Sequence, residues 1–330
     1  MNAVLVNEKG ELIDKKVPIS EPSGHDVLIA IKAVSVNPVD FKQAEQNKNK
    51  SPKILGYDAI GEVVKNGYKA TKYNVGDMVF YAGTTTRNGS NADYQLVDER
   101  ITSKAPKKIE PVKAVALPLT WLTAYEILID KLNLSFHKNV NQGTVLIING
   151  AGGVGSITIQ LAKWLGLKVF ATSSPQNFEW LKKLGCDIEL DYHQSLVKQV
   201  YKNGYRNVNS VINLYDTAKY FDEAADLISP FGHIANIVET EKPLPLQKLQ
   251  SKSASFDWEL MFTKFDQGYN FESQGSELSS LAKLLENHQI KSTLTKCLNG
   301  PIKAQNLKTA YDLLRSHKMK GKIVISNENK

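Results

Sequence analysis

The sequence predicts an α/β protein in which a doubly wound parallel sheet is inserted into a mostly β domain. Three observations indicate this fold. Residues 1–105 have the period-2 pattern of strands, residues from about 110 alternate apolar strands with helices, and the last segment closes with a further strand. The 330 residues also exceed the ~250–300 at which a single core stops growing, so two domains are expected.

The first segment is predicted to form short strands separated by turns. Its apolar runs are rich in β-branched residues, and Gly76-Asp77 supplies a turn before one of them. The expected strands are Val27–Val36, Ile60–Val64, Met78–Gly83 and Ala92–Val97.

The second segment alternates strands with helices. It begins with a helical pattern over residues 114–132, which Pro118 interrupts. The expected strands are Val145–Asn149, Lys168–Ser173, Ser210–Leu214 and His233–Val238. Three helices are expected. The first carries Val154, Ile157, Leu161 and Leu165 on one face, and the second carries Phe178, Leu181 and Leu184 and ends at Gly185 as its C-terminal cap. The third covers Lys219–Ile228. This order favours a parallel sheet.

The last segment returns to the first domain. Leu307, Ala310, Tyr311 and Leu314 share one helical face, and Lys322–Ile325 is an apolar strand that an edge of the first domain could accept. We therefore place residues 1–121 and 273–330 in one domain and residues 122–272 in the other.

Composition excludes several classes of protein. The net charge is +7, from 41 basic and 34 acidic residues, but the lysines are scattered, and the dense spots around Lys48 and Lys318–Lys322 lack interleaved aromatics. A solvated surface is the better interpretation, with no nucleic-acid partner. We find neither an apolar run of about 20 residues nor a signal-peptide pattern, so a cytoplasmic protein without a membrane partner is expected. Cys186 and Cys297 form no C-x-x-C pair and are interpreted as ordinary thiols.

The strongest motif is the glycine-rich stretch Asn149–Gly155, which places G-x-G-x-x-G between a buried strand and an apolar-faced helix. Gly150 permits the tight turn, Gly152 lets the backbone approach a diphosphate, and Gly155 lets helix and strand pack closely. Gly153 and Val154 would present backbone N–H groups at the helix N-terminus, where the dipole favours negative charge. A dinucleotide-binding site is predicted.

The end of the next strand distinguishes NADPH from NADH. NADH binding calls for a carboxylate there to accept the ribose 2′-hydroxyl. This chain has Thr172, Ser173 and Ser174 instead, whose hydroxyls could donate to a 2′-phosphate. No basic residue follows directly, and Lys182 and Lys183 are expected to face solvent. NADPH is the predicted cofactor, although Ser174 could also be a plain helix cap.

At this point the sequence resembles a medium-chain dehydrogenase/reductase of the zinc-free quinone oxidoreductase branch. The resemblance covers nearly the whole chain and also extends to bacterial proteins called zinc-type alcohol dehydrogenase-like. It rests on VNPVD (36–40), GYDAIGEV (56–63), VGDMV (75–79), GSNADYQLVDERI (89–101), LPLTWLTAYEIL (117–128), the glycine motif and KGKIVI (320–325). It implies a Rossmann domain inserted in a GroES-like catalytic domain.

The resemblance also indicates where zinc ligands are missing. The zinc alcohol dehydrogenases carry a cysteine where this chain has VNPVD, with Asn37 and Asp40, and a histidine where it has Gly56-Tyr57-Asp58. The four-cysteine lobe for a structural zinc is absent. Because a catalytic zinc takes about three protein ligands of nitrogen, sulfur or oxygen, we expect no metal.

The family further implies a cleft between the domains that receives the nicotinamide. By this resemblance Thr123 would contact the nicotinamide, and Leu214 and Ile237 would mark strand ends near the cofactor. Tyr192 would approach the adenosine phosphate. Asn37 and Asp40 would lie near the cofactor as well, with Asp40 positioning the loop or the nicotinamide ribose.

Without a metal, hydrogen-bond donors must stabilise the oxygen that becomes negative after hydride transfer. Tyr57 and Asn37 are the candidate donors, with Asp40 as a supporting residue and water as a source of the final proton. A plain interpretation is equally open: Asn37-Pro38 could be a turn whose amide binds backbone, and Asp58 could make a structural hydrogen bond.

The leading hypothesis is therefore an NADPH-dependent reductase of quinones or α,β-unsaturated carbonyls. Alternatives are an alkenal or enoyl double-bond reductase, and an NADPH-binding sensor or structural protein with little catalysis. Neither G-x-S-x-G nor G-x-x-x-x-G-K-[ST] occurs, which disfavours a hydrolase and a phosphoryl transferase. The strand-like segment Ser255–Phe262 and the family suggest a homodimer.

Overall fold

A computed structural model describes residues 1–327 and divides the chain into two compact units. Unit 1 consists of Met1–Leu122 and the segment that begins at Phe262, and unit 2 is Thr123–Met261. The first boundary lies within one residue of the predicted one. The second lies at 261/262 rather than 272/273, because residues just after it are bound within unit 1. Lys264 forms a buried ion pair with Glu277 at 2.7 Å, and Glu272 pairs with Arg100 at 3.2 Å.

Unit 2 contains a parallel sheet with the strand order β11-β10-β9-β12-β13-β14. The chain reverses its direction of winding between β9 and β12, which are neighbours in this sheet. Its strands are β9 (Thr144–Ile148), β10 (Lys168–Ser173), β11 (Ile188–Asp191), β12 (Val208–Asn213), β13 (Ile228–Asn236) and β14 (Ser255–Trp258). The predicted doubly wound parallel sheet is confirmed.

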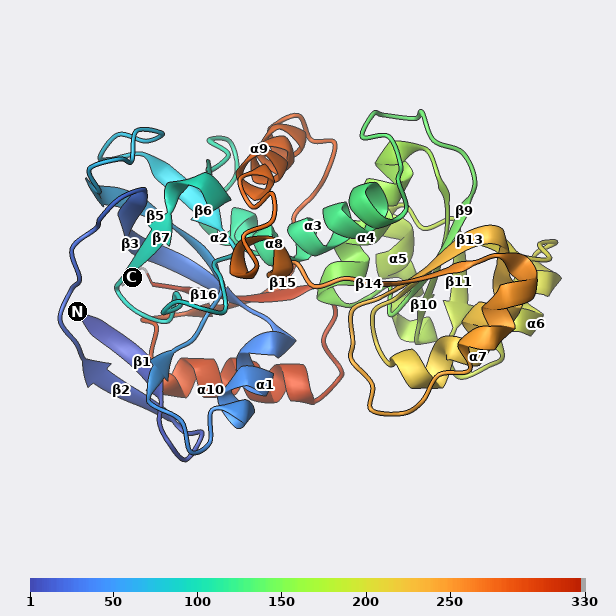
Figure 1. Cartoon of the computed structure of the whole chain (residues 1–330), viewed down its shortest axis with the longest axis horizontal. Coiled ribbons are helices and arrows are strands. Elements are labelled where there is room, and N and C mark those ends of the chain that lie inside the picture. Colours follow the sequence, from blue (N-terminus) through green and yellow to red (C-terminus); the bar gives the residue numbers. More distant parts are fainter. Residues whose placement is uncertain (328–330) are drawn as a thin grey trace. The chain divides into compact units, whose positions relative to one another are not determined.

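Helices follow the strands of unit 2 (Figure 1) and complete its core. Glycines in the left-handed conformation end α4 and α5, Gly166 at φ 108° and Gly185 at φ 100°, so the predicted cap at Gly185 is confirmed. The helices are η2 (Glu126–Lys131), α4 (Gly153–Leu165), η3 (Pro175–Asn177), α5 (Phe178–Leu184), α6 (Leu196–Lys202), α7 (Thr217–Leu227) and η4 (Leu246–Lys252). β9, β10 and β12 are buried along most of their length, as expected for parallel strands that helices cover on both faces.

Unit 1 is built on a mostly antiparallel sheet along the path β15-β16-β3-β5-β6-β8, with β7 also paired to β3, and on a smaller sheet β2-β1-β4. The strands are β1 (Asn2–Val6), β2 (Leu12–Lys16), β3 (Asp26–Val36), β4 (Lys53–Ile54), β5 (Asp58–Asn66), β6 (Met78–Tyr81), β7 (Tyr94–Asp98), β8 (Thr102–Lys104), β15 (Leu294–Asn299) and β16 (Lys322–Ser326). The predicted GroES-like domain is confirmed, with a β1–β2 hairpin that the sequence pattern did not predict.

Helices of unit 1 come from both ends of the chain. They are α1 (Pro38–Gln46), η1 (Glu99–Ile101), α2 (Pro111–Ala114), α3 (Pro118–Tyr125), α8 (Thr263–Asp266), α9 (Ser273–Glu286) and α10 (Ala304–Arg315); α3 contains the boundary with unit 2. In Figure 1, α10 lies beside α1, and β16 lies beside β3. The C-terminal strand therefore completes the sheet that the N-terminal strands begin, as predicted.

The segment Pro111–Lys131 corrects one expectation. It is long and apolar enough to cross a membrane by length and composition, with a mean hydropathy of 1.4. However, 78% of the apolar window is buried inside the protein, so the segment is a core helix.

Candidate functional site

The glycine-rich turn of unit 2 joins the end of β9 to the start of α4. Asn149 takes a left-handed conformation at φ 68°, which asparagine tolerates better than most residues. Thr172 of β10 fixes the turn twice, since its hydroxyl accepts from Asn149 N at 2.9 Å and its carbonyl accepts from Gly150 N at 2.8 Å. Gly152 is the N-cap of α4 and makes no side-chain cap, so no side chain competes for the first-turn N–H groups.

The three motif glycines lie where a side chain would collide with the turn. A Cβ at Gly155 would lie 2.2 Å from the carbonyl oxygen of Asn149, and one at Gly150 would lie 2.7 Å from Cβ of Ala171. A Cβ at Gly152 would lie 2.9 Å from the Asn149 side-chain amide. The resulting concave backbone with unpaired amides fits a dinucleotide diphosphate.

The hydroxyls at the end of β10 divide into two groups. Thr172 is 1% exposed and its hydroxyl is bound to the turn, which argues against its predicted contact with a 2′-phosphate. The Ser173 hydroxyl donates to the carbonyl of Ser174 at 2.9 Å, and Ser174 is the N-cap residue of η3 without a side-chain cap. These two serines lie at the predicted place. Lys182 pairs with Glu179 and is exposed, as expected.

A carboxylate that the sequence reasoning did not weigh lies on the neighbouring strand. Asp191 of β11 is in register with Ser173 of β10. It accepts from the backbone N–H of His193 at 3.0 Å and contacts the His193 ring at 2.6 Å, and these bonds lower the pKa of its carboxyl. Tyr192 pairs through its backbone with Ser173 and is 42% exposed, so its ring is available at this edge.

The other residues assigned to the cofactor also lie at carboxyl ends of strands. Leu214 follows β12 and its carbonyl accepts from the Asn149 amide at 3.4 Å, while Ile237 follows β13 and donates to Asn213. These ends flank the point between β9 and β12 where the winding reverses, which is where such sheets bind ligands. Thr123, on α3, is buried in unit 2.

Unit 1 contains a buried polar network around Lys322, the first residue of β16. The ammonium lies 3.1 Å from the carboxylate of Asp58 and donates to Asn37 Oδ1 and to the carbonyl of Val36. The side chains of Lys322 and Asp58 are 4% and 0% exposed. Asp58 also accepts from Asn37 Nδ2 at 2.8 Å and from the backbone N–H of Leu119 at 2.7 Å. A buried ion pair is stable only when hydrogen bonds complete it in this way.

This network occupies both ends of the Asn37 amide. Its oxygen accepts from Lys322, and its nitrogen donates to Asp58 and, at 3.4 Å, to the carbonyl of Ser35. An amide bound in this way has little capacity left for a substrate oxygen. The geometry argues against Asn37 as a donor to the acceptor. The plain interpretation was a turn whose amide binds backbone, but the amide binds mainly the side chains of Asp58 and Lys322 and has the carbonyl of Ser35 as its backbone partner.

Asp40 is buried in the first turn of α1 and accepts from the backbone N–H of Asn37 at 2.5 Å. Burial raises the pKa of its carboxyl to about 7, and the charge of Asp58 also raises it. The backbone hydrogen bond from Asn37 and the charge of Lys322 lower this pKa. Asp40 therefore holds the first turn of α1 through its bond to the backbone of Asn37, and the raised pKa of its carboxyl follows mainly from burial.

Tyr57 precedes β5 and is 2% exposed, with its ring 4.7 Å from that of Phe262. Among residues 1–327 its hydroxyl has no hydrogen-bond partner. Burial, followed by the charges of Asp40 and Asp266, raises the pKa of Tyr57 far above its ordinary value. The phenol therefore stays protonated and can act as a hydrogen-bond donor.

The residues do not fit a zinc ion. In the described part of the chain, no group of three or more histidine, cysteine, aspartate or glutamate side chains could hold a metal. The expected ligand positions carry the bound amide of Asn37 and the phenol of Tyr57. Cys186 is buried, its Sγ lies 3.2 Å from the carbonyl of Ile188, and burial raises the pKa of its thiol to about 12.

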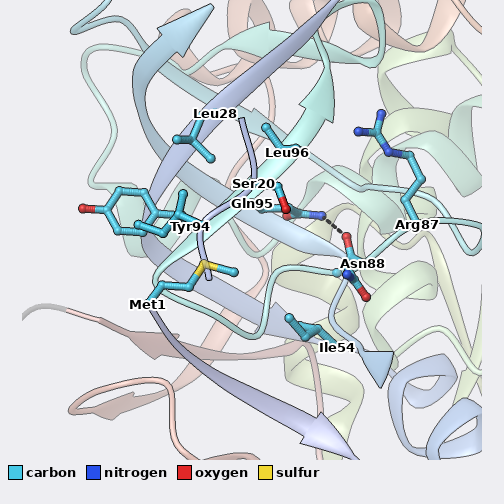
Figure 2. Close-up of a pocket in the computed structure, with 11 residues that line it drawn as sticks. Met1, Ser20, Leu28, Ile54, Arg87, Asn88, Tyr94, Gln95 and Leu96 are labelled. Atoms are coloured by element: carbon cyan, nitrogen blue, oxygen red, sulfur yellow. Dashed lines mark hydrogen bonds between the residues drawn. The ribbon is translucent and has the colours of Figure 1, made fainter. Parts of the chain in front are cut away.

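A pocket in unit 1, shown in Figure 2, lies apart from these groups. It has a volume of about 160 Å³ and is lined mostly by apolar side chains such as Leu28 and Leu96. Two of its polar side chains have partners. Arg87 pairs with Asp26 at 2.7 Å, and Gln95 donates to the carbonyl of Asn88 at 3.0 Å. We assign it no role.

The two units together define an oxidoreductase of the alcohol dehydrogenase type. The sequence model of the alcohol dehydrogenase GroES-like domain matches residues 23–107, and that of the zinc-binding dehydrogenase matches residues 153–264. The chain is 39% identical over 311 residues to a zinc-type alcohol dehydrogenase-like protein of Staphylococcus epidermidis, covering 93% of this chain and 92% of the relative. The chain belongs to the medium-chain dehydrogenase/reductase superfamily.

Solved structures agree with this assignment. A putative zinc-dependent alcohol dehydrogenase of Rhizobium etli matches with a TM-score of 0.93 and 37% identity, covering 100% of this chain and 99% of that one. The quinone oxidoreductase of Coxiella burnetii matches with a TM-score of 0.81 and 25% identity over 99% of each chain. A chloroplastic NADPH-dependent alkenal/one oxidoreductase of Arabidopsis thaliana is 29% identical, covering 95% of this chain and 75% of that protein.

Sequence reasoning missed two residues near Tyr57. Lys322 was interpreted as part of an apolar strand and of a solvated run of lysines, and its 4% exposed side chain shows that the second interpretation is wrong for this residue. A charged residue at the start of such a strand is a signal that it has a buried partner. Tyr311 was assigned to an apolar helix face. It is 3% exposed, and its hydroxyl, like that of Tyr57, has no hydrogen-bond partner among residues 1–327.

Proposed function

We propose that this protein is a cytoplasmic NADPH-dependent reductase that passes hydride, without zinc, to a quinone or to an α,β-unsaturated carbonyl. The observation that carries the proposal is the Tyr57 hydroxyl, which is buried and has no partner among the described residues. A buried hydroxyl without a partner is unfavourable, so a bound acceptor oxygen is its natural counterpart. The quinone oxidoreductase and the alkenal/one oxidoreductase among the similar proteins support this class of acceptor.

The proposed chemistry assigns a separate role to each group. NADPH supplies the hydride when it is bound to the glycine turn. Tyr57 donates a hydrogen bond to the carbonyl oxygen, which becomes negative as hydride arrives at the conjugated system. Lys322, Asp58 and Asn37 hold Tyr57 and the first turn of α1 in place. Water supplies the final proton to the reduced product.

The preference for NADPH rests on the end of β10. Ser173 and Ser174 place hydroxyls there, and the nearest carboxylate, Asp191, is bound to the turn at His193. The Ser174 hydroxyl accepts from Asn177 and keeps its proton, so a 2′-phosphate would meet a donor there. The Ser173 hydroxyl donates to the carbonyl of Ser174 and would have to turn to reach the phosphate. Thr172 is buried and accepts from the glycine turn, so it contributes less to this preference.

A second candidate is a reductase of alkenal or enoyl double bonds. The name of the Arabidopsis relative favours it, and the same phenol could bind the carbonyl of such a substrate. A panel of quinones, enones and alkenals, with NADPH consumption as the measurement, separates the two. Tight NADPH binding without turnover of any acceptor would instead indicate a sensor or structural protein.

The decisive experiment combines that panel with two comparisons. Purified protein is assayed with NADPH and NADH, and Tyr57→Phe is compared with the wild type. We expect NADPH to bind more tightly than NADH and the Tyr57→Phe variant to lose about 10²-fold in kcat. Metal analysis should find no stoichiometric zinc, and a chelator should leave activity unchanged. Equal affinities for NADPH and NADH would contradict the proposed cofactor preference. An unchanged kcat in Tyr57→Phe would contradict the proposed role of Tyr57.

A further inference from the structure

The buried tyrosines of unit 1 divide into two pairs. The Tyr73 hydroxyl donates to the carbonyl of Thr102 at 2.8 Å, and the Tyr81 hydroxyl donates to Gln95 at 2.8 Å. The Tyr57 and Tyr311 hydroxyls are equally buried, and neither has a partner within residues 1–327. Because buried hydroxyls are nearly always satisfied, two unsatisfied ones in one unit need an explanation.

Both unsatisfied phenols lie near the first turn of α1. The ring of Tyr311, on α10, contacts that of Phe41 at 6.1 Å, and Phe41 directly follows Asp40 in α1. Tyr57 is tied to the same turn, since its neighbour Asp58 binds the Asn37 amide at the start of the helix.

Asn91 contacts the surroundings of both Tyr57 and Tyr311. Its backbone N–H donates to the carbonyl of Leu55, two residues before Tyr57. Its side chain is also a polar neighbour of the Tyr311 hydroxyl, although it does not meet the geometry of a hydrogen bond.

The causes that raise the pKa of the two phenols indicate that they share one environment. After burial, the charge of Asp40 is the next cause that raises the pKa of each phenol, and Tyr57 itself acts on Tyr311. Both phenols are therefore neutral donors at physiological pH.

We propose that Tyr311 is a second hydrogen-bond donor to the acceptor, which binds together with Tyr57 to the carbonyl oxygen of the substrate. This proposal rests on the proposed function and deepens it. A carbonyl oxygen has two lone pairs and can accept from two phenols, and an ortho-quinone offers one oxygen to each. No proton needs to leave either phenol, because the hydrogen bonds alone stabilise the developing negative charge.

Tyr311→Phe tests this inference, with Tyr81→Phe as the matched control. Both changes remove one buried hydroxyl and little volume, but only that of Tyr81 is bound within the protein. Turnover is measured with NADPH and 9,10-phenanthrenequinone, which has no free ring position for thiol addition, and with 2-cyclohexen-1-one. We expect Tyr311→Phe to lower kcat by about 10- to 100-fold, with an unchanged Kd for NADPH and an unchanged or higher unfolding midpoint. Tyr81→Phe should keep kcat and lower the midpoint.

The outcomes separate this inference from the proposed function. Normal wild-type turnover with an unchanged kcat in Tyr311→Phe would overturn the role of Tyr311 alone. A lowered unfolding midpoint with activity lost in proportion to the folded fraction would show a structural hydroxyl and also overturn it. If the wild type reduces no acceptor, the proposed function fails. Equilibrium binding of 9,10-phenanthrenequinone without NADPH then decides about Tyr311, because equal affinities of wild type and variant would exclude its contact.

Discussion

The α-carbon of Gly152 faces the side-chain amide of Asn149, which itself reaches the carbonyl of Leu214. We expect Gly152→Val to abolish NADPH binding and to leave the fold intact, since the added side chain meets the flexible end of Asn149 and fills the space of the diphosphate. Fluorescence titration with NADPH measures the binding, and circular dichroism with the unfolding midpoint serves as the control. Retained binding would mean that the diphosphate binds elsewhere.

Asp40 gives the stability of the protein a specific pH dependence. Its folded-state pKa of about 7 exceeds the ordinary 3.8, so the stabilising contribution is complete at low pH and is lost as pH rises through 7. The groups that face it are Lys322, whose charge lowers the pKa, Asp58, whose charge raises it, and the neutral phenols Tyr57 and Tyr311.

Asp40→Asn removes this titration while keeping an oxygen that can accept from Asn37. We expect the stability of the variant relative to the wild type to increase between pH 4 and 7.5 by about 2–4 kcal/mol, from the roughly 1.4 kcal/mol for each unit of pKa shift. Urea unfolding of both proteins across this range measures it. Parallel curves would show that Asp40 is ionised throughout.

Single residues of the site were predictable only where a motif constrains the backbone. The glycine turn was correctly located because G-x-G-x-x-G needs a strand before it and a helix after it, and both patterns are visible. The second role of Thr172 was not predicted, since no local pattern shows that its hydroxyl accepts from Asn149. Lys322 and Asn37 are 285 positions apart, and a contact at such a separation leaves no trace in one sequence.

At the scale of elements, β16 contributes more than backbone pairing to unit 1, because Lys322 neutralises Asp58. We expect Lys322→Met to destabilise the protein by about 3–5 kcal/mol, since it leaves a buried carboxylate without its cation. The double variant Asp58→Asn, Lys322→Met should recover part of this loss. Chemical denaturation measures all three proteins.

The control for this cycle is Lys32→Met, which breaks the exposed pair between Lys32 and Glu62 at 3.9 Å. Because exposed pairs contribute about 0–1 kcal/mol, this change should have little effect. If Lys322→Met were as mild as Lys32→Met, the buried pair would not stabilise the unit.

Strand and helix positions in unit 2 followed well from hydrophobic period. β10 has the predicted bounds, and α7 (Thr217–Leu227) differs from the predicted Lys219–Ile228 by one or two residues at each end. Elements of unit 1 were less predictable. The strand β2 is exposed along most of its length and β4 has two residues, so neither carries the apolar alternation that a pattern search detects.

At the scale of the whole molecule, the edge strand β14 leads us to propose a homodimer. β14 pairs with β13 on one side and ends the order of the unit 2 sheet. Trp258 and Leu260 are 47% and 59% exposed there, and an open edge with large apolar side chains favours association with a second copy.

We expect Trp258→Glu combined with Leu260→Glu to shift the protein from dimer to monomer without unfolding it, because the charges would be buried at the interface. Sedimentation velocity measures the oligomeric state. Lys242→Glu, in the exposed turn after β13, controls for charge alone. A wild-type monomer, or a variant that remains dimeric, would contradict the proposal.

The position of Lys322 also affects how the protein is made. During translation, Asn37 and Asp58 are synthesised first and are followed by all of unit 2. Lys322, whose ammonium binds both residues, is added only near the end. Since domains tend to fold in order as they leave the ribosome, the nascent chain can complete unit 2 while the buried carboxylate of unit 1 still lacks its cation. Loss of the last dozen residues to a premature stop codon should therefore yield a polypeptide that still retains nucleotide but is readily degraded.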